Sequence, residues 1–262
     1  MQQLNFINNG AQIADSVQID HFSVIHDDVI IGENTWIGSN VTIYPGARIG
    51  KNCRIFPGAV ISAVPQDLKF ADEYTTTIIG DNCTIRECVT INRGTRDKEK
   101  TVIGDNCLIM AYCHVAHDCI IGDNVILANS VQLAGHVELG DHAFIGGTSA
   151  VHQFVKIGEH AMIGGGSLVR KDVPPFITAA KEPLSYLGLN TLGLRRRGFD
   201  NQRIAEIQEI YRTLFLSGLN FTDAIQAVKN QFNPSSDTKS ILNFFMQSKR
   251  GIIKKHNGEG LE

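Results

Sequence analysis

The stretch IIGENTWIGSNVTIYPGARIGKNCRI, residues 30–55, carries an isoleucine at every sixth position from Ile31 onward. The same register, extended from residue 7 to residue 169, meets an aliphatic residue at 25 of 28 positions. A small residue (alanine, valine, serine, threonine or cysteine) stands four positions after nearly every one of them. Glycine and asparagine, which tolerate the left-handed backbone of a tight corner, often lie in between. A six-residue repeat therefore organises this part of the chain.

A period of six fits neither regular element alone, because an α-helix repeats every 3.6 residues and a strand alternates every two. Short strands joined by corners do fit it. Three hexads then close a triangular coil, and successive coils stack as parallel strands. We expect about nine coils and, at ~4.8 Å per coil, a prism roughly 45 Å long. The period itself does not fix the hand of the coil.

Two polar segments interrupt the repeat, Pro65–Thr77 and Gly94–Thr101. The register is the same on both sides of each, so we expect both segments to leave the prism as loops. Long loops on a regular scaffold commonly carry binding residues.

The repeat ends at Pro174-Pro175. We predict a β-helix domain over residues 1–185 and a helical domain over residues 186–262 that covers the open end of the prism. The tail KKHNGEGLE is expected to be disordered. Each of the three expected helices begins at a capping residue, namely Asp200, Thr222 and Ser236.

The bulk composition excludes several classes of protein. Only 19% of the residues are charged and the formal net charge is −3, whereas a nucleic-acid-binding protein is usually basic. No apolar run approaches the ~18–20 residues that span a bilayer, and we identify no signal peptide at the start. The six cysteines form no CxxC pair, as is typical of small buried residues in a reducing compartment. We expect a cytoplasmic protein without nucleic acid or an integral membrane association.

Four histidines cluster between residues 114 and 152: His114, His117, His136 and His152. In an 18-residue coil, His117 shares a column with Gly135 and Gln153, and Asp118 shares one with His136. This patch suits acyl transfer to a hydroxyl. A neutral histidine accepts the hydroxyl proton, a carboxylate orients it, and a glycine N–H donates to the oxyanion.

Seven segments resemble the UDP-N-acetylglucosamine O-acyltransferases of lipid A biosynthesis, a family of hexapeptide-repeat enzymes. They are VAHDC (115–119), LAGHV (133–137), VHQF (151–154), PQDLKF (65–70), IRECVTINRGT (85–95), DVPPF (172–176) and LRRRGF (194–199). The resemblance implies a left-handed parallel β-helix and a homotrimer. It also implies transfer of an (R)-3-hydroxyacyl chain from acyl carrier protein to the 3-hydroxyl of UDP-N-acetylglucosamine.

The resemblance also assigns roles to residues. His117 matches the general base, Asp118 the orienting acid and Gly135 the oxyanion donor, while Gly165 matches a position that leaves room for the acyl chain. Positions that line the substrate cleft match Asp67, Lys69, His114, His136, His152 and Gln153. Positions near the nucleotide match Asn190, Arg196 and Arg197.

Three other interpretations remain. The related lipid A N-acyltransferase carries an additional N-terminal domain, whereas here the repeat begins by residue 7. A zinc carbonic anhydrase of the same repeat class would bind metal through His114, His117 and His136, but its usual His-x4-His spacing is absent, so we expect no metal and no cofactor. A non-enzymatic β-helix scaffold would explain the prism but neither the polar patch nor the two loops.

Overall fold

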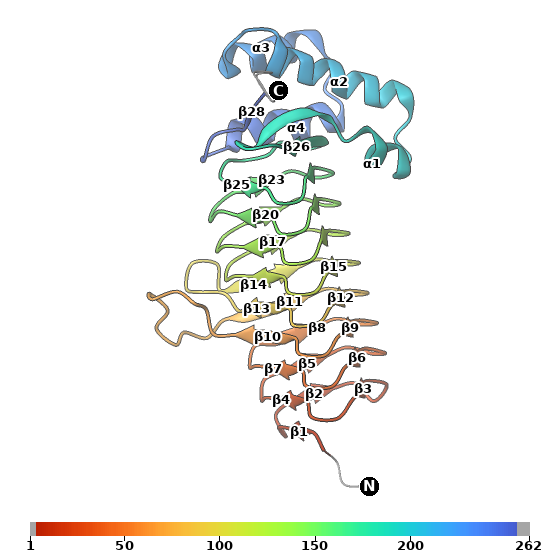
Figure 1. The fold of residues 1–262 in the computed structure, drawn as a ribbon, viewed down its shortest axis with the longest axis vertical. Helices are drawn as coiled ribbons and strands as arrows, with labels where there is room; N and C mark the ends of the chain where they lie inside the picture. The colour runs from red at the N-terminus through yellow and green to blue at the C-terminus, as the bar shows by residue number, and fades with distance from the viewer. Residues whose placement is uncertain (1–3, 256–262) are drawn as a thin grey trace.

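The computed structural model describes residues 4–255, which form a left-handed parallel β-helix followed by a small helical region (Figure 1). The predicted fold class is confirmed. Most strands of the prism are two residues long, and every coil contributes one strand to each of three faces. Partners within a face are 18 residues apart wherever the repeat is uninterrupted, as for His114 and Gln132.

Within the described residues, the first face holds nine strands: β1 (Phe6–Ile7), β4 (Val24–Ile25), β7 (Thr42–Ile43), β10 (Val60–Ala63), β13 (Thr90–Asn92), β16 (His114–Val115), β19 (Gln132–Leu133), β22 (Ala150–Val151) and β25 (Leu168–Val169). The second face holds β2 (Gln12–Ile13), β5 (Ile30–Ile31), β8 (Ala47–Ile49), β11 (Thr76–Ile79), β14 (Lys100–Ile103), β17 (Ile120–Ile121), β20 (Glu138–Leu139) and β23 (Lys156–Ile157). The third face begins with β3 (Gln18–Ile19), β6 (Trp36–Ile37), β9 (Arg54–Ile55), β12 (Thr84–Ile85), β15 (Leu108–Ile109), β18 (Ile126–Leu127), β21 (Phe144–Ile145) and β24 (Met162–Ile163).

The aliphatic residue of each hexad points into the prism and forms its core. From Ile25 onward these side chains are buried, whereas Ile7, Ile13 and Ile19 of the first coil are only partly buried because no coil precedes them. The small residue four positions later is also buried, which accounts for five of the six cysteines. Only Cys88 is exposed.

Each corner of the prism is turned by the third residue after the aliphatic one. Asparagine often takes this place, and Asn106 and Asn124 have φ near 57°. Such left-handed backbone is uncommon outside glycine, asparagine and aspartate. Asp118 (φ 59°) and His136 (φ 63°) occupy the same position of their coils. The repeat therefore fixes the backbone from which both polar side chains project.

Both interruptions leave the prism at one corner, where the first face meets the second. Residues 64–75 connect β10 to β11, and residues 93–99 connect β13 to β14. Figure 1 shows them projecting together from one side. The register survives both, because Ile91 pairs with Ile61 in the coil before it and with Val115 in the coil after it.

The end of the prism is covered by three strands and four helices that follow the repeat (Figure 1). The third face continues with β26 (Ile177–Ala180), β27 (Ser185–Leu189) and β28 (Lys254–Lys255). The helices are α1 (Thr191–Arg196), α2 (Asn201–Leu216), α3 (Phe221–Gln231) and α4 (Ser236–Gln247). Tyr211 of α2 is fully buried and donates a hydrogen bond to the Pro175 carbonyl at 2.6 Å, which ties the helices to the last coil.

The predicted helix starts are correct for α2, which is capped by Asp200. The caps of α3 and α4 are instead Asn220 and Ser235. The expectation of a disordered tail is wrong for Lys254 and Lys255, which pair with β27, and residues 256–262 lie outside the described part. None of the helices in residues 4–255 is both long enough and apolar enough to cross a membrane.

Candidate active site

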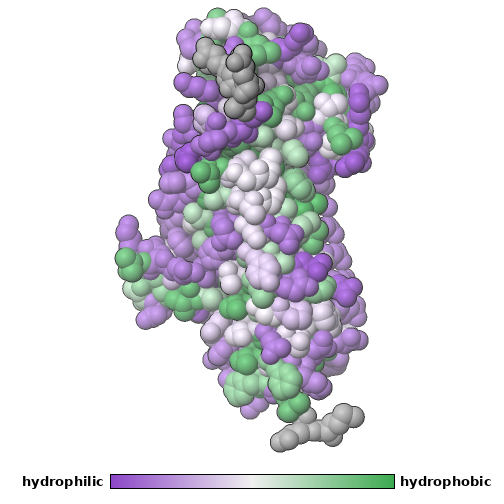
Figure 2. Space-filling model, in the orientation of Figure 1, coloured by the Kyte–Doolittle hydropathy of each residue, from purple (hydrophilic) through white to green (hydrophobic). Residues whose placement is uncertain are grey.

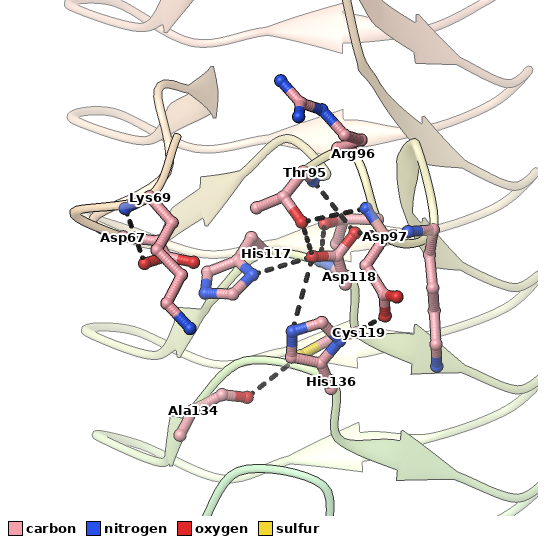
Figure 3. Close-up of polar contacts among 12 residues, drawn as sticks. Asp67, Lys69, Thr95, Arg96, Asp97, His117, Asp118, Cys119, Ala134 and His136 are labelled. Atoms are coloured by element: carbon pink, nitrogen blue, oxygen red, sulfur yellow. Dashed lines mark hydrogen bonds and ion pairs between the residues drawn. The ribbon is translucent and has the colours of Figure 1, made fainter. Parts of the chain in front are cut away.

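The candidate site lies on the corner between the first and second faces, one coil beyond the second loop and two coils beyond the first. β16 ends at Val115 and β17 begins at Ile120, so the corner between them presents His117 and Asp118 (Figure 3). The His117 Nδ1–H donates to Asp118 Oδ2 at 2.8 Å. Among residues 4–255, His117 Nε2 makes no hydrogen bond, so its lone pair is available to a substrate proton.

The Asp118 carboxylate is completely buried and is held by the second loop. Thr95 donates twice, from its backbone N–H to Oδ1 at 2.9 Å and from its hydroxyl to Oδ2 at 2.6 Å. Burial raises the pKa of Asp118, but the hydrogen bonds from His117 and Thr95 outweigh it and lower that pKa to about 2. The carboxylate is therefore ionised at neutral pH and fixes the tautomer of His117.

His136 completes the polar cluster from the next coil. Its Nε2 lies 3.7 Å from Asp118 Oδ2, and its Nδ1 lies 3.2 Å from Asp97 Oδ2. The ring stands perpendicular to that of His117, at 5.1 Å between centroids, and stacks on Phe154 at 4.4 Å. Burial lowers the pKa of His136 despite the opposing charge of Asp118, which favours a neutral imidazole.

Gly135 lies directly against the His117 ring. A Cβ atom at this position would come within 2.5 Å of His117 Cε1 and 2.7 Å of Nε2, so a side chain would displace the imidazole. Within the described residues, the Gly135 N–H donates no hydrogen bond. The column of His117 and Gly135 predicted from the 18-residue spacing is thus present.

The first loop faces the same corner and helps to enclose a cleft of about 520 Å³. The cleft is lined by Asp67, Lys69, Glu73, Thr95, Arg96, Asp97, His136 and Phe154. Of the predicted residues, Asp67, Lys69 and His136 therefore come together beside the His117–Asp118 pair.

The other residues predicted for the cleft lie beside it, His114 on the first face and His152 and Gln153 on the same corner as His117. His114, on β16, is bonded to the Thr90 hydroxyl at 2.7 Å, and burial lowers its pKa. His152 and Gln153 stand one coil beyond Gly135, where His152 Nδ1 lies 3.2 Å from the Gln153 carbonyl.

Four predicted residues lie at the other two corners. Asn190 caps α1 and donates to the His160 carbonyl at 2.9 Å, and Arg197 donates to the His142 carbonyl at 3.2 Å, both where the second face meets the third. Arg196 is exposed on the last turn of α1. Gly165 lies on the corner between the third face and the first. One chain does not bring these residues to His117.

Sequence reasoning missed five residues that line the cleft: Glu73, Thr95, Arg96, Asp97 and Phe154. Thr95 occupies the small-residue position of its hexad, so the repeat marked it as core. Its role could have been inferred from the preserved register, because that register places the second loop one coil before Asp118.

The structure brings together a different set of possible metal ligands from the three imidazoles considered above. Atoms of His117, Asp118 and His136 lie within 4.8 Å of one another, while His114 is bonded to Thr90. In the described residues, Asp118 Oδ2 already accepts hydrogen bonds from His117 and Thr95. Hydrogen-bond donors therefore already occupy this carboxylate oxygen, as is required of an acid that orients a histidine.

Known proteins resemble this chain along most of its length. Residues 28–63 and 100–135 match the family model for bacterial transferase hexapeptide repeats, and residues 172–253 match that for Udp N-acetylglucosamine O-acyltransferase, domain 2. The acyl-(acyl-carrier-protein)–UDP-N-acetylglucosamine O-acyltransferase of Chlorobaculum parvum is 58% identical over 193 residues, 73% of each chain. That of Aquifex aeolicus is 54% identical over 198 residues, covering 75% of this chain and 76% of the relative.

Solved structures match nearly the whole chain. The UDP-N-acetylglucosamine acyltransferase of Bacteroides fragilis has a TM-score of 0.95 at 46% identity, over 97% of this chain and 100% of its own. That of Francisella novicida has a TM-score of 0.95 at 40% identity, over 98% and 94%.

A hexapeptide β-helix that carries a histidine paired with a buried aspartate on one corner defines an acyltransferase of the hexapeptide-repeat class. Within that class, the chain belongs to the UDP-N-acetylglucosamine O-acyltransferase family.

Proposed function

We propose that this enzyme transfers an (R)-3-hydroxyacyl chain from acyl carrier protein to the 3-hydroxyl of UDP-N-acetylglucosamine, the first step of lipid A biosynthesis. The observation that carries the proposal is the His117–Asp118 pair, with its available Nε2 beside the Gly135 N–H. The relatives named for this reaction support it. The test is an assay of the purified enzyme with UDP-N-acetylglucosamine and a ladder of 3-hydroxyacyl carrier proteins. Absence of product with every chain length contradicts the proposal.

The arrangement of His117, Asp118 and Gly135 supports a direct transfer. His117 Nε2 removes the proton of the sugar hydroxyl as the oxygen attacks the thioester carbonyl. The Gly135 N–H donates to the oxyanion that forms, and buried Asp118 stabilises the imidazolium. The intermediate then collapses, the C–S bond breaks, and the imidazolium returns its proton to the departing thiolate. The acyl group never becomes attached to the enzyme.

The residues around the pair suit the two substrates. Lys69, Asp67 and neutral His136 offer donors and acceptors to the sugar within the cleft. His114 extends this polar surface onto the first face, and His152 and Gln153 extend it along the corner. We assign Asn190, Arg196 and Arg197 to the nucleotide. An arginine guanidinium can donate two parallel hydrogen bonds to phosphate oxygens, which suits Arg196 and Arg197 to this role.

These nucleotide residues and Gly165 lie at corners other than that of His117, so the full site needs neighbouring subunits. In a cyclic trimer, the His117 corner of each subunit would face a different corner of its neighbour. Three subunits complete the ring. We therefore propose a cytoplasmic homotrimer. In it the β-helix domain of residues 1–185 carries the catalytic residues, and the helical domain of residues 186–262 covers the end of the prism and contributes the nucleotide residues.

Light scattering is expected to give about three times the subunit mass of 28.7 kDa. Enzyme diluted until the trimer dissociates should lose activity in parallel with the loss of trimer, because each site uses residues from two chains. A stable monomer with full activity contradicts the shared site.

Replacing Thr95 with valine should lower kcat about tenfold, because the buried carboxylate of Asp118 loses a charged hydrogen bond that is typically worth ~1.5–3 kcal/mol. The KM for the nucleotide sugar should stay within twofold, since Thr95 acts through Asp118. Thr95→Ser, which keeps the hydroxyl, should restore kcat. If serine and valine variants behave alike, Thr95 does not position Asp118.

A further inference from the structure

A second cavity, of about 610 Å³, lies near the helical end of the prism, where β25 meets residues 182–185 and β28. Its apolar lining is formed by Leu168, Pro183, Leu184 and Ile253. Around these stand four cations and one acid: Arg170, Lys171, Lys254, Lys255 and Glu182. We call this set the basic pocket.

The charges of the basic pocket are largely uncompensated. Arg170 pairs with Glu182 at 2.9 Å, and both side chains are more than half exposed. Within residues 4–255, no carboxylate forms an ion pair with Lys171, Lys254 or Lys255. Figure 2 shows hydrophilic residues gathered along the side of the prism from the loops to the helical end. An apolar floor rimmed by like charges is suited to a partner of opposite charge.

The basic pocket reaches the corner of the active site through Lys171, whereas its residues 182–185 follow β26 at the corner between the third face and the first. Lys171 occupies the same place in its coil as Gln153, Gly135 and His117, each one coil further back. The strand pairs confirm this spacing, because His114 pairs with Gln132, Gln132 with Ala150, and Ala150 with Leu168. Three strand spacings separate Lys171 from His117, or about 14 Å along the prism.

That separation fits the arm on which a carrier protein holds its acyl thioester. A phosphopantetheine chain has about as many backbone bonds as four to five residues of extended peptide, which span roughly 15 Å. An arm rooted at the basic pocket and running along this corner would deliver the thioester carbonyl to His117 and Gly135.

We propose that the basic pocket is the docking surface for the acidic face of acyl carrier protein, with Lys171, Lys254 and Lys255 meeting its carboxylates. This inference rests on the proposed function and adds the place where the donor binds. The charges of the basic pocket would determine the association rate of the donor and its KM. Acyl transfer itself would take place at His117, three strand spacings away.

The test compares two donors, the 3-hydroxyacyl carrier protein and the same acyl group on free phosphopantetheine. We expect the variant K171Q/K254Q/K255Q to lower the ratio of kcat/KM for the carrier-bound donor to that for the free donor at least tenfold. The ratio should also lose most of its dependence on ionic strength. A matched control, K51Q/K229Q/K239Q, removes the same charge from exposed lysines elsewhere and should leave the ratio within twofold.

Three results would overturn the docking surface. They are an unchanged ratio in the pocket variant, an equal fall in the control, and a fall explained by a changed oligomeric state on light scattering. Inactivity of the wild type on both donors would instead contradict the proposed function, so the two failures are distinguishable.

Discussion

Replacing His117 with alanine is expected to lower kcat about 10²–10⁴-fold, which is the usual contribution of a positioned general base. In the proposed mechanism the imidazole accepts the substrate proton at Nε2, while its Nδ1–H donates to Asp118 Oδ2, which also accepts from the Thr95 hydroxyl. His136 Nε2 is 3.7 Å from the same oxygen, too distant to take over that hydrogen bond without moving. Steady-state rates with saturating donor and acceptor measure the loss.

The fold should survive this change. The His117 side chain lies outside the aliphatic core, so the melting temperature should shift by no more than a few degrees. His21→Ala, at an exposed corner residue between the first and second coils, is the matched control and should keep full activity. Activity of the His117 variant within threefold of wild type would refute the assignment of the base.

Replacing Gly165 with methionine is expected to shorten the preferred acyl chain by several carbons. Each buried methylene contributes about 0.8 kcal/mol, so four lost methylenes change relative kcat/KM by about two orders of magnitude. The side chain would enter the groove from a neighbouring subunit, because Gly165 is on a different corner from His117. Activity on short chains should remain, since His117 and Gly135 are unchanged. Measurements of kcat/KM across the acyl ladder test this.

The alternative for Gly165 is a purely conformational role, and the local geometry argues against it. The left-handed residue of this corner is Gly166, with φ of 70°, not Gly165. A Cβ atom on Gly165 would meet only the Gly147 backbone, at 3.3 Å from its carbonyl oxygen. We therefore expect Gly165→Met to fold, and Gly165→Ala to shift the preference less. Equal losses on every chain length, with a lowered melting temperature, would support the conformational role instead.

The prism and the core of its active site could be predicted because both follow from one period. Once 18 residues make a coil, His117 must stand beside Gly135, and Asp118 beside His136. The same rule even places Lys171 on that corner. Contacts between neighbouring coils can thus be predicted directly from the spacing of the residues in the sequence.

What escaped prediction depends on contacts that no period encodes. Thr95 has the size of a core residue, and only its hydroxyl on Asp118 reveals its role. Helix α1 has six residues, too few to show a helical pattern, and begins at Asn190 because that side chain caps it. Lys254 and Lys255 form a strand only because β27 offers an edge for them to pair with.

The two ends of the prism are unlike each other, and this asymmetry bears on how the molecule opens. Each coil touches only its neighbours, so unfolding in such a stack proceeds inward from an end. The helices and β26–β28 seal one end, while Ile7, Ile13 and Ile19 at the other are incompletely packed. Local unfolding should therefore start at the first coil, and its free energy should rise with each further coil that unfolds. His117 lies several coils from that end, and local unfolding that starts there seldom extends so far. The corner that carries His117 can therefore remain folded while the first coil fluctuates.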